Sequence, residues 1–183
     1  VEPGLLAAAD YLDRARREGL WRGFPTLAGT SELWVSGFVA THLARADAPI
    51  DLAPTVEALL SRRAPDGGWS YGSAVPTDAD STAWCLSAVS RQMPDEESAR
   101  AREVLMEHRV DDSFATYRAE SGIGDFVGSP PTGVLGWTGP HPDVAAAVLL
   151  AGVPEPGTPD EDRFLGRLVS SANATGLIPS YWW

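Results

Sequence analysis

A Gly- and aromatic-rich loop followed by an apolar helix recurs along this chain, and this repeat restricts its fold more than any other feature. The clearest copy is residues 66–89, in which the turn DGGW leads through an irregular connector into the helix start DADS at residues 78–81. Each unit consists of an amphipathic helix, the loop and a more uniformly apolar helix, and units begin near residues 4, 52, 95 and 159. Repeats of this kind are typical of stacked helical hairpins that bury a shared core.

Apolar residues at helical spacing predict the individual helices. The expected helices are 4–18, a second beginning at Ser31 or Glu32, 52–63, 78–91, 94–109, 141–151 and 160–172. No segment shows the alternating pattern of a strand, so loops are expected at 19–30, 64–77, 110–140 and 173–183. A helix that is apolar on most sides must be buried, so the second helix of each unit is the inner one. The predicted fold is all-α, an α/α toroid of helical hairpins that forms a single domain over residues 1–183.

The fourth unit stops at Tyr181-Trp182-Trp183, where its inner helix is expected to begin. The toroid is therefore expected to be incomplete, with exposed tryptophans at its end unless something covers them. We expect a homo-oligomer, a partner subunit or a missing C-terminal segment to complete the barrel.

Charge and composition exclude several classes of protein. The formal net charge of −11 argues against a nucleic-acid or anionic-membrane partner, because both require a basic surface. No apolar run is long enough to span a bilayer. The single cysteine excludes an internal disulfide and fits a cytoplasmic location, with peripheral contact to a membrane left open.

If the hairpins curve into a barrel, the long loops lie at one end and the inner-helix N-termini meet there. The acidic and histidine side chains that would converge on this mouth are Glu32, Asp78, Asp80, His141 and Asp143. Helix capping offers a simpler interpretation, because short polar side chains and acids stabilise the first turn of a helix. His42 and His108 fall on helices away from the mouth and are expected to be ordinary residues.

The loop and helix start at 66–89 resemble a known family. DGGW is similar to the QW-type repeat of the prenyltransferase/squalene-oxidase repeat superfamily, and DADSTA resembles the DxDDTA motif of class II terpene cyclases such as squalene-hopene cyclase. The segments GLWRGF, GWTGPHPDV and GLIPSYWW extend the resemblance over most of the chain. The resemblance implies an α/α barrel and a protonation-initiated cyclisation of a polyprenyl or polyene substrate, with no cofactor. Asp80 would be the general acid and Asp78 its companion, while Ser81 stands where the motif has its third aspartate.

A general acid must be protonated near neutral pH. The helix dipole lowers the pKa of a carboxyl in the first turn, whereas a neighbouring carboxylate and a dry environment raise it. The side chains expected to bind substrate beside the acid are Glu32, Trp34, Phe38, Trp84, Trp137 and Asp143. Aromatic faces among them would stabilise a carbocation, and His141 or Asp143 would receive the final proton.

Two other functions stay open at this point. The same acidic and histidine side chains, Asp78, Asp80, His141 and Asp143, could ligate a metal in a transferase or lyase. Protein prenyltransferase β-subunits share the fold and use a zinc site with a D-x-C pair, which this chain lacks. The third possibility is a non-catalytic binder of an apolar ligand, or a subunit that needs a partner.

Overall fold

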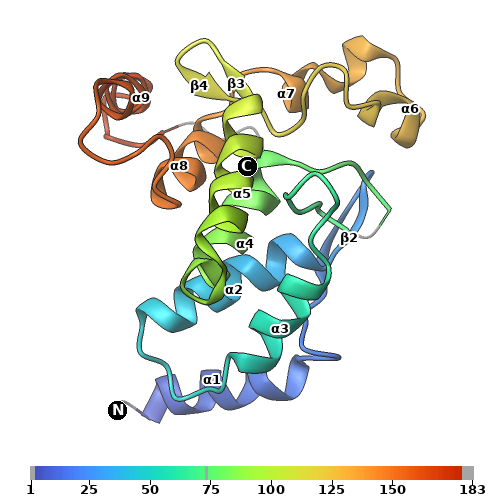
Figure 1. Cartoon of the computed structure of the whole chain (residues 1–183), viewed down its shortest axis with the longest axis vertical. Coiled ribbons are helices and arrows are strands. Elements are labelled where there is room, and N and C mark those ends of the chain that lie inside the picture. Colours follow the sequence, from blue (N-terminus) through green and yellow to red (C-terminus); the bar gives the residue numbers. More distant parts are fainter. Residues whose placement is uncertain (1–2, 73, 179–183) are drawn as a thin grey trace.

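The structure, a computed structural model, describes residues 3–72 and 74–178 and is mainly helical (Figure 1). Its elements in chain order are α1 (Pro3–Ala15), β1 (Gly23–Thr26), β2 (Gly29–Ser31), α2 (Leu33–Arg45), α3 (Ala53–Ser61), α4 (Ala79–Val89), η1 (Ser90–Gln92), α5 (Asp95–Glu107), β3 (Arg109–Val110), β4 (Ser113–Phe114), α6 (Ile123–Val127), η2 (Pro131–Val134), α7 (Leu135–Thr138), α8 (Pro142–Leu150) and α9 (Pro159–Ser170).

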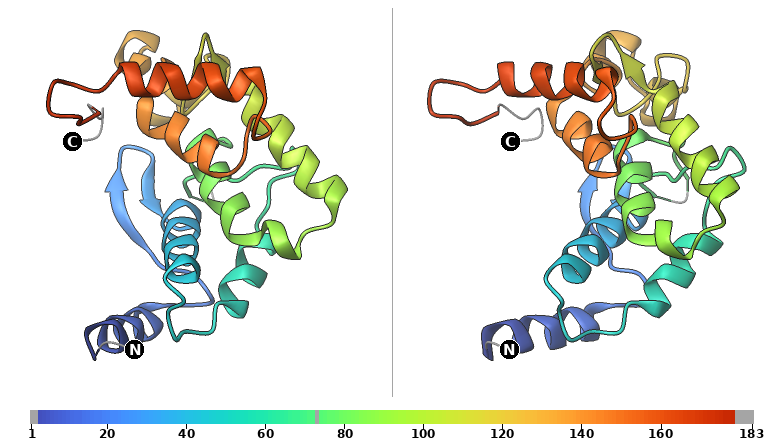
Figure 2. Two further views of the ribbon diagram at one scale, coloured as in Figure 1. Left: turned by 90° about the vertical axis from the view of Figure 1, so that its left-hand side faces the viewer. Right: turned by 60° about the vertical axis from the view of Figure 1, so that its left-hand side comes forward.

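The helices form two curved layers. The inner layer is α2, α4 and α8, with α4 packed against both of the others. The outer helices α3, α5 and α9 follow the outside of the curve, and the whole makes an open half ring (Figure 2). Most side chains of α4 are buried, as expected for a helix with neighbours on several sides. This arrangement confirms the predicted alternation of outer and inner helices and the incomplete α/α toroid.

The DGGW turn fastens the end of α3 to the start of α4. Trp69 is fully buried, and its indole Nε1 donates a hydrogen bond to the Leu59 carbonyl at 2.8 Å. The Trp69 backbone N–H donates to Thr82 Oγ1 in α4 at 2.9 Å. Gly67 has a φ of 101°, a conformation that a residue with a side chain rarely adopts. The turn thus fixes where α4 begins, and with it the position of Asp80.

Two of the predicted loops contain regular structure, so these expectations were wrong in detail. Within 19–30, β1 pairs antiparallel with β2, with an irregular register between Gly23 and Pro25. Within 110–140, β4 pairs with β3, and α6, η2 and α7 follow. Gly122 and Gly128, both with positive φ, bound α6. Elements of two to five residues are too short to show a period in the sequence.

The loops meet at the inner-helix N-termini, as predicted. Glu32 N–H donates to the Tyr71 carbonyl at 3.1 Å, joining the start of α2 to the 64–77 segment. Ala79 N–H donates to the Thr116 carbonyl at 2.9 Å, and His141 N–H to the Phe114 carbonyl at 2.8 Å. The starts of α2, α4 and α8 therefore lie at the same end of the molecule. The expected exposure of Trp182 and Trp183 concerns residues outside the described part.

Candidate active site

Asp78 caps α4 from a buried position. Its Oδ1 accepts a hydrogen bond from Ser81 N–H at 2.7 Å, and the residue is 1% exposed. Burial raises the pKa of Asp78 to about 8; the hydrogen bond from Ser81 opposes this shift, and the charge of Asp80 adds to it. Asp78 is therefore both the helix cap and a carboxyl that keeps its proton at neutral pH.

Asp80 lies two residues later and remains partly exposed. Its Oδ2 accepts a hydrogen bond from Trp34 Nε1 at 2.7 Å, across the packing of α2 against α4. Burial raises the pKa of Asp80 to about 7. The hydrogen bond from Trp34 and an interaction with Trp84 lower this pKa, whereas the negative charge of Asp143 raises it. Burial therefore outweighs the hydrogen bonds from the two tryptophans, and Asp80 can exist in both protonation states near neutral pH.

Ser81 replaces the third acid of the family motif, and its surroundings explain how the chain tolerates this change. The side chain is fully buried, and its backbone N–H holds Asp78. An aspartate at this position would add a third carboxyl to a place where two already resist ionisation.

A series of contacting aromatic rings begins at the partner of Asp80, and we call them the aromatic strip: Phe24, Trp34, Phe38, Tyr71 and Trp84. Trp34 stacks on Phe38 with ring centroids 5.5 Å apart, and Phe38 meets Trp84 edge-to-face at 5.0 Å. Phe24 meets Trp34 edge-to-face at 5.4 Å, and Tyr71 lies 6.4 Å from Trp34. Trp34 and Phe38 are only partly buried, so each residue keeps some exposed surface.

The other expected site residues are distributed differently. Glu32 forms an ion pair with Arg22, with Oε1 2.7 Å from Nε. Asp143, in the first turn of α8, is partly exposed and lies 4.0 Å from His141 Nδ1. His141 is 1% exposed, and burial lowers its pKa despite the opposing effect of Asp143. The structure thus brings Asp143 toward Asp80 but encloses His141 in the protein.

Trp137 lies in a second apolar cluster that reaches one member of the aromatic strip, Tyr71. It lies in α7 in an apolar cluster separate from the main core, with its ring 5.9 Å from that of Tyr117. Tyr71 of the aromatic strip packs against this same cluster, so the predicted place of Trp137 beside the substrate stays a prediction.

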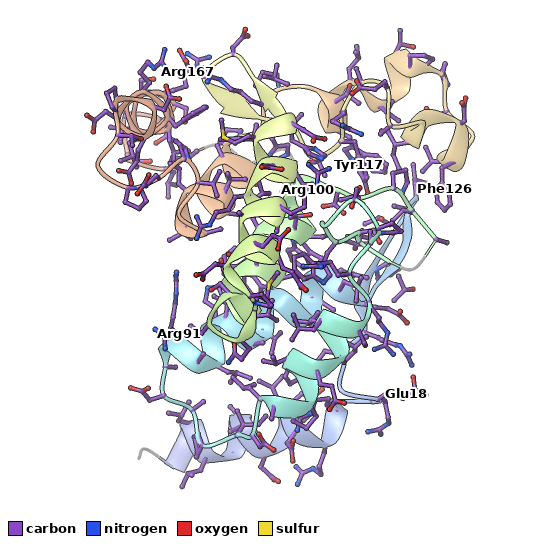
Figure 3. The ribbon with its side chains drawn as sticks, in the orientation of Figure 1. Glu18, Arg91, Arg100, Tyr117, Phe126 and Arg167 are labelled. Carbon is purple, nitrogen blue, oxygen red and sulfur yellow. The ribbon has the colours of Figure 1, made fainter. Side chains whose placement is uncertain are left out.

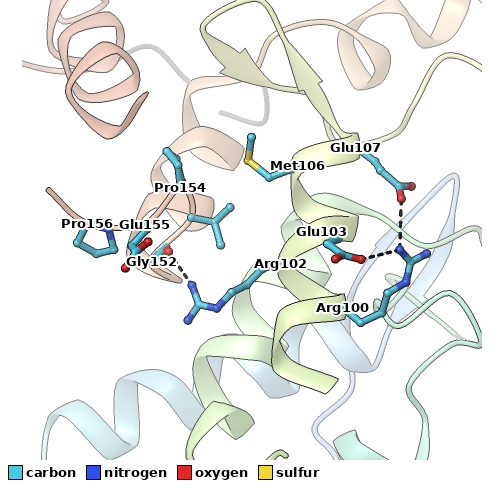
Figure 4. A pocket seen from close by; sticks show the side chains of 10 residues that line it. Arg100, Arg102, Glu103, Met106, Glu107, Gly152, Pro154, Glu155 and Pro156 are labelled. Atoms are coloured by element: carbon cyan, nitrogen blue, oxygen red, sulfur yellow. Dashed lines mark hydrogen bonds and ion pairs between the residues drawn. The ribbon is translucent and has the colours of Figure 1, made fainter. Parts of the chain in front are cut away.

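The larger cavities do not coincide with Asp80. One, of about 960 Å³, lies between α5 and residues 152–156, where Arg102 donates to the Gly152 carbonyl at 2.6 Å (Figure 4). Another, of about 750 Å³, lies against α3. Asp80 instead contacts the aromatic strip through Trp34, where α2 and α4 of the inner layer pack together. The half ring opens to the left in the left-hand view of Figure 2, and Figure 3, in the orientation of Figure 1, labels Arg91 on the left side and Tyr117 on the right.

No group of three or more His, Cys, Asp or Glu side chains that could hold a metal ion is found among residues 3–72 and 74–178. The geometry of the described residues gives the metal-dependent alternative no support. In the same part of the chain, no helix is long and apolar enough to cross a membrane.

Solved structures similar to this chain include a type II terpene cyclase, MstE from Scytonema. An Asp-to-Asn variant of MstE in complex with geranylgeranyl dihydroxybenzoate, described as its substrate, is 31% identical, with a TM-score of 0.79 over 98% of this chain and 53% of that one. An Asp-to-Ala variant in complex with merosterolic acid A, described as its product, is 30% identical, with a TM-score of 0.80 over 98% of this chain and 54% of that one. The chain has a class II terpene cyclase-like fold.

The match extends to a protein from Actinoplanes, which is 27% identical with a TM-score of 0.75 over 98% of this chain and 55% of that one. The chain therefore spans about half the length of these cyclase-like structures. No family model and no curated protein sequence matches it.

The sequence analysis did not single out three aromatic side chains whose rings contact the aromatic strip or belong to it: Phe24, Tyr71 and His42. Phe24 lies in the short strand β1 and Tyr71 in the 64–77 segment, where no periodic signal shows which side chains point inward. His42 was assigned to the ordinary residues. Its spacing from Trp34 and Phe38, at eight and four residues, would have placed it on the same face of the helix.

Proposed function

We propose that this chain supplies the acid-bearing half of a class II terpene cyclase active site, in which Asp80 protonates a terminal double bond of a polyprenyl or polyene substrate. One observation carries the proposal: a carboxyl with a pKa of about 7 lies where the aromatic strip begins. An acid with this pKa can both deliver a proton and recover one near neutral pH.

The chemistry of the first step follows from this geometry. The Asp80 O–H bond breaks, and the π electrons of the terminal alkene form a new C–H bond. The resulting tertiary cation is attacked by the next double bond, which closes a ring and moves the positive charge along the substrate. Rings of the aromatic strip stabilise this charge through their faces, an interaction of about 2 kcal/mol or more when water is excluded.

Asp78 tunes the acid without touching the substrate. It is buried and its pKa is about 8, so it is mostly neutral when Asp80 transfers its proton. Trp34 has the opposite effect, because its N–H stabilises the carboxylate that remains on Asp80 after transfer. Asp143, partly exposed on α8, raises the pKa of Asp80 by its negative charge.

The substrate class is inferred from the related cyclase. MstE is described in complex with a geranylgeranyl-substituted dihydroxybenzoate and with a cyclised product. We extend the polyprenyl part of that ligand to this chain, because an apolar chain of alkenes matches an acid followed by aromatic faces. The proposal also requires the concave side of the half ring to be closed during turnover, since an exposed cation would be captured by water.

The test compares the wild-type protein with Asp80→Asn on geranylgeranyl-bearing substrates, with products detected by mass spectrometry. Asparagine keeps the shape of the side chain but has no carboxyl proton, so turnover should fall by about 10²–10⁴-fold. Asp162→Asn is the matched control, because it removes an exposed first-turn carboxylate from the outer helix α9. Melting curves confirm that both variants fold. Unchanged turnover in Asp80→Asn would refute the mechanism.

A further inference from the structure

His42 extends the aromatic strip away from the acid. Its ring centroid lies 4.3 Å from that of Phe38 and 5.2 Å from that of Trp84, and the residue is exposed. On α2 it follows Trp34, the partner of Asp80, by eight residues. Because an α-helix rises 1.5 Å per residue, His42 stands about 12 Å further along the helix than Trp34. The strip therefore has an acid at one end and an imidazole toward the other.

The surroundings of His42 select which ring nitrogen carries the proton. Nδ1 lies 2.9 Å from the Phe38 backbone carbonyl oxygen. A carbonyl only accepts hydrogen bonds, so Nδ1 must be the donor. In the neutral ring, Nε2 then has a lone pair and no proton. The hydrogen bond to the Phe38 carbonyl thus leaves Nε2, on the other side of the His42 ring, as the nitrogen that can accept a proton.

We infer that His42 is the catalytic base that ends the cyclisation, an inference that rests on the proposed function. After ring closure, Nε2 removes a proton from a carbon next to the cationic carbon. The electrons of that C–H bond become the new double bond, and His42 becomes an imidazolium. The substrate has gained one proton from Asp80 and lost one to His42, so the overall reaction is an isomerisation. Return of a proton from His42 to solvent, and from solvent to Asp80, resets the site.

The other candidate bases are less well placed for this step. His141 is 1% exposed and enclosed by protein, so a substrate on the concave side does not reach it. Asp143 lies in the first turn of α8 and raises the pKa of Asp80 by its charge, which places it at the acid end. Ring closure carries the cation away from the protonated carbon, toward the end where His42 lies.

The first test reads the tautomer of His42 in the full chain, without requiring turnover. The chain has three histidines, and His42→Gln assigns the relevant signals in ¹⁵N-resolved NMR spectra of the imidazole rings. The neutral ring should carry its proton on Nδ1. N,N-Dimethyloctylamine, whose ammonium group mimics the cation, should shift the His42 Nε2 signal and the indole signals of Trp34 and Trp84. A proton on Nε2 in the neutral ring, or an Nε2 signal indifferent to the amine, would overturn the inference.

The second test measures products. His42→Phe keeps an aromatic ring for stacking but has no basic nitrogen, and His42→Gln removes both. In each variant we expect the fraction of the wild-type alkene to fall by at least about tenfold, with water-captured alcohols or other alkene isomers in its place. Asp80→Asn should instead reduce all products together.

Asp47→Asn is the matched control for the product test. Asp47 is exposed just beyond α2 and has a φ of 46°, which asparagine also tolerates. This variant should keep the wild-type product ratio. An unchanged ratio and rate in both His42 variants would overturn the role of His42 alone. Absence of cyclised product from the wild-type protein would overturn the proposed function together with the inference that rests on it.

Discussion

Substituting Gly37 tests whether the close crossing of α2 and α4 holds the site together. A Cβ atom on Gly37 would lie 2.7 Å from the Cys85 backbone nitrogen and 2.8 Å from the Trp84 carbonyl carbon. Non-bonded carbon atoms pack at about 3.5–4.0 Å, so Gly37→Ala forces the two helices apart. The obstructing atoms are backbone atoms, and no side-chain rotation relieves the contact.

The magnitude follows from two opposing effects. Alanine favours the helix by about 1 kcal/mol relative to glycine. Overpacking of a well-packed contact costs about 1–3 kcal/mol, and rigid backbone neighbours place this site at the upper end. The net loss in the free energy of unfolding is therefore about 2 kcal/mol, or a decrease of roughly 4–8 °C in Tm for a chain of this size.

Gly166→Ala is the matched control, because Gly166 also lies inside a helix, α9, but a Cβ atom there would meet nothing within 4 Å. This variant should gain up to about 1 kcal/mol, since only the helix preference acts. Urea denaturation measures both free energies of unfolding. A Gly37→Ala protein as stable as Gly166→Ala would show that α2 and α4 do not approach each other this closely.

Two further predictions concern the acids. Burial raises the pKa of Asp78 in the folded protein from its ordinary 3.8 to about 8, so the folded state binds this proton more tightly than the unfolded state does. The stability that the protonated carboxyl contributes is complete below pH 3.8 and is lost as the pH rises through about 8. Asp78→Asn keeps a side chain that can cap the helix but cannot ionise. By urea denaturation, this variant should be more stable than the wild-type protein at pH 8 but not at pH 4. Equal stability of the two proteins at pH 8 would contradict the raised pKa. Trp34→Phe removes the hydrogen bond that lowers the pKa of Asp80, so the carboxyl should titrate above about 7 in ¹³C NMR. An unchanged titration midpoint of Asp80 in this variant would mean that the hydrogen bond from Trp34 to Asp80 does not form in solution.

The helical layers could be predicted from the sequence because their cause is local and repeated. The run from Ala83 to Val89 is mostly apolar, as expected for a helix that is buried on several sides. The helix that begins at Asp95 has charged residues on its exposed side. The short hairpins and α6 could not be predicted, because positive-φ residues such as Gly122 create them within a few residues. Such elements depend on turn geometry rather than on hydrophobic period.

The candidate site was predictable in part for a related reason. Asp78 and Asp80 stand at a helix start, and the repeat brings helix starts together. Whether a side chain points into the concave side depends on packing between elements, which one sequence does not encode locally. The sequence therefore did not show that the His141 side chain is almost fully enclosed, or that Trp137 packs with Tyr117 in a second apolar cluster. The sequence also did not show that His42, away from the mouth along its helix, contacts the rings of Phe38 and Trp84.

The source of the first proton is the most direct test of the account, and it is measured by running the reaction in D₂O. The Asp80 carboxyl exchanges with solvent, so protonation of the terminal alkene should place one deuterium on the carbon that accepted the proton. Mass spectrometry should show a product one mass unit heavier, and NMR should locate the label at the substrate terminus. The same label should disappear with the product in Asp80→Asn. A cyclised product without deuterium would show that the reaction begins by another route, and would contradict the assignment of Asp80 as the acid.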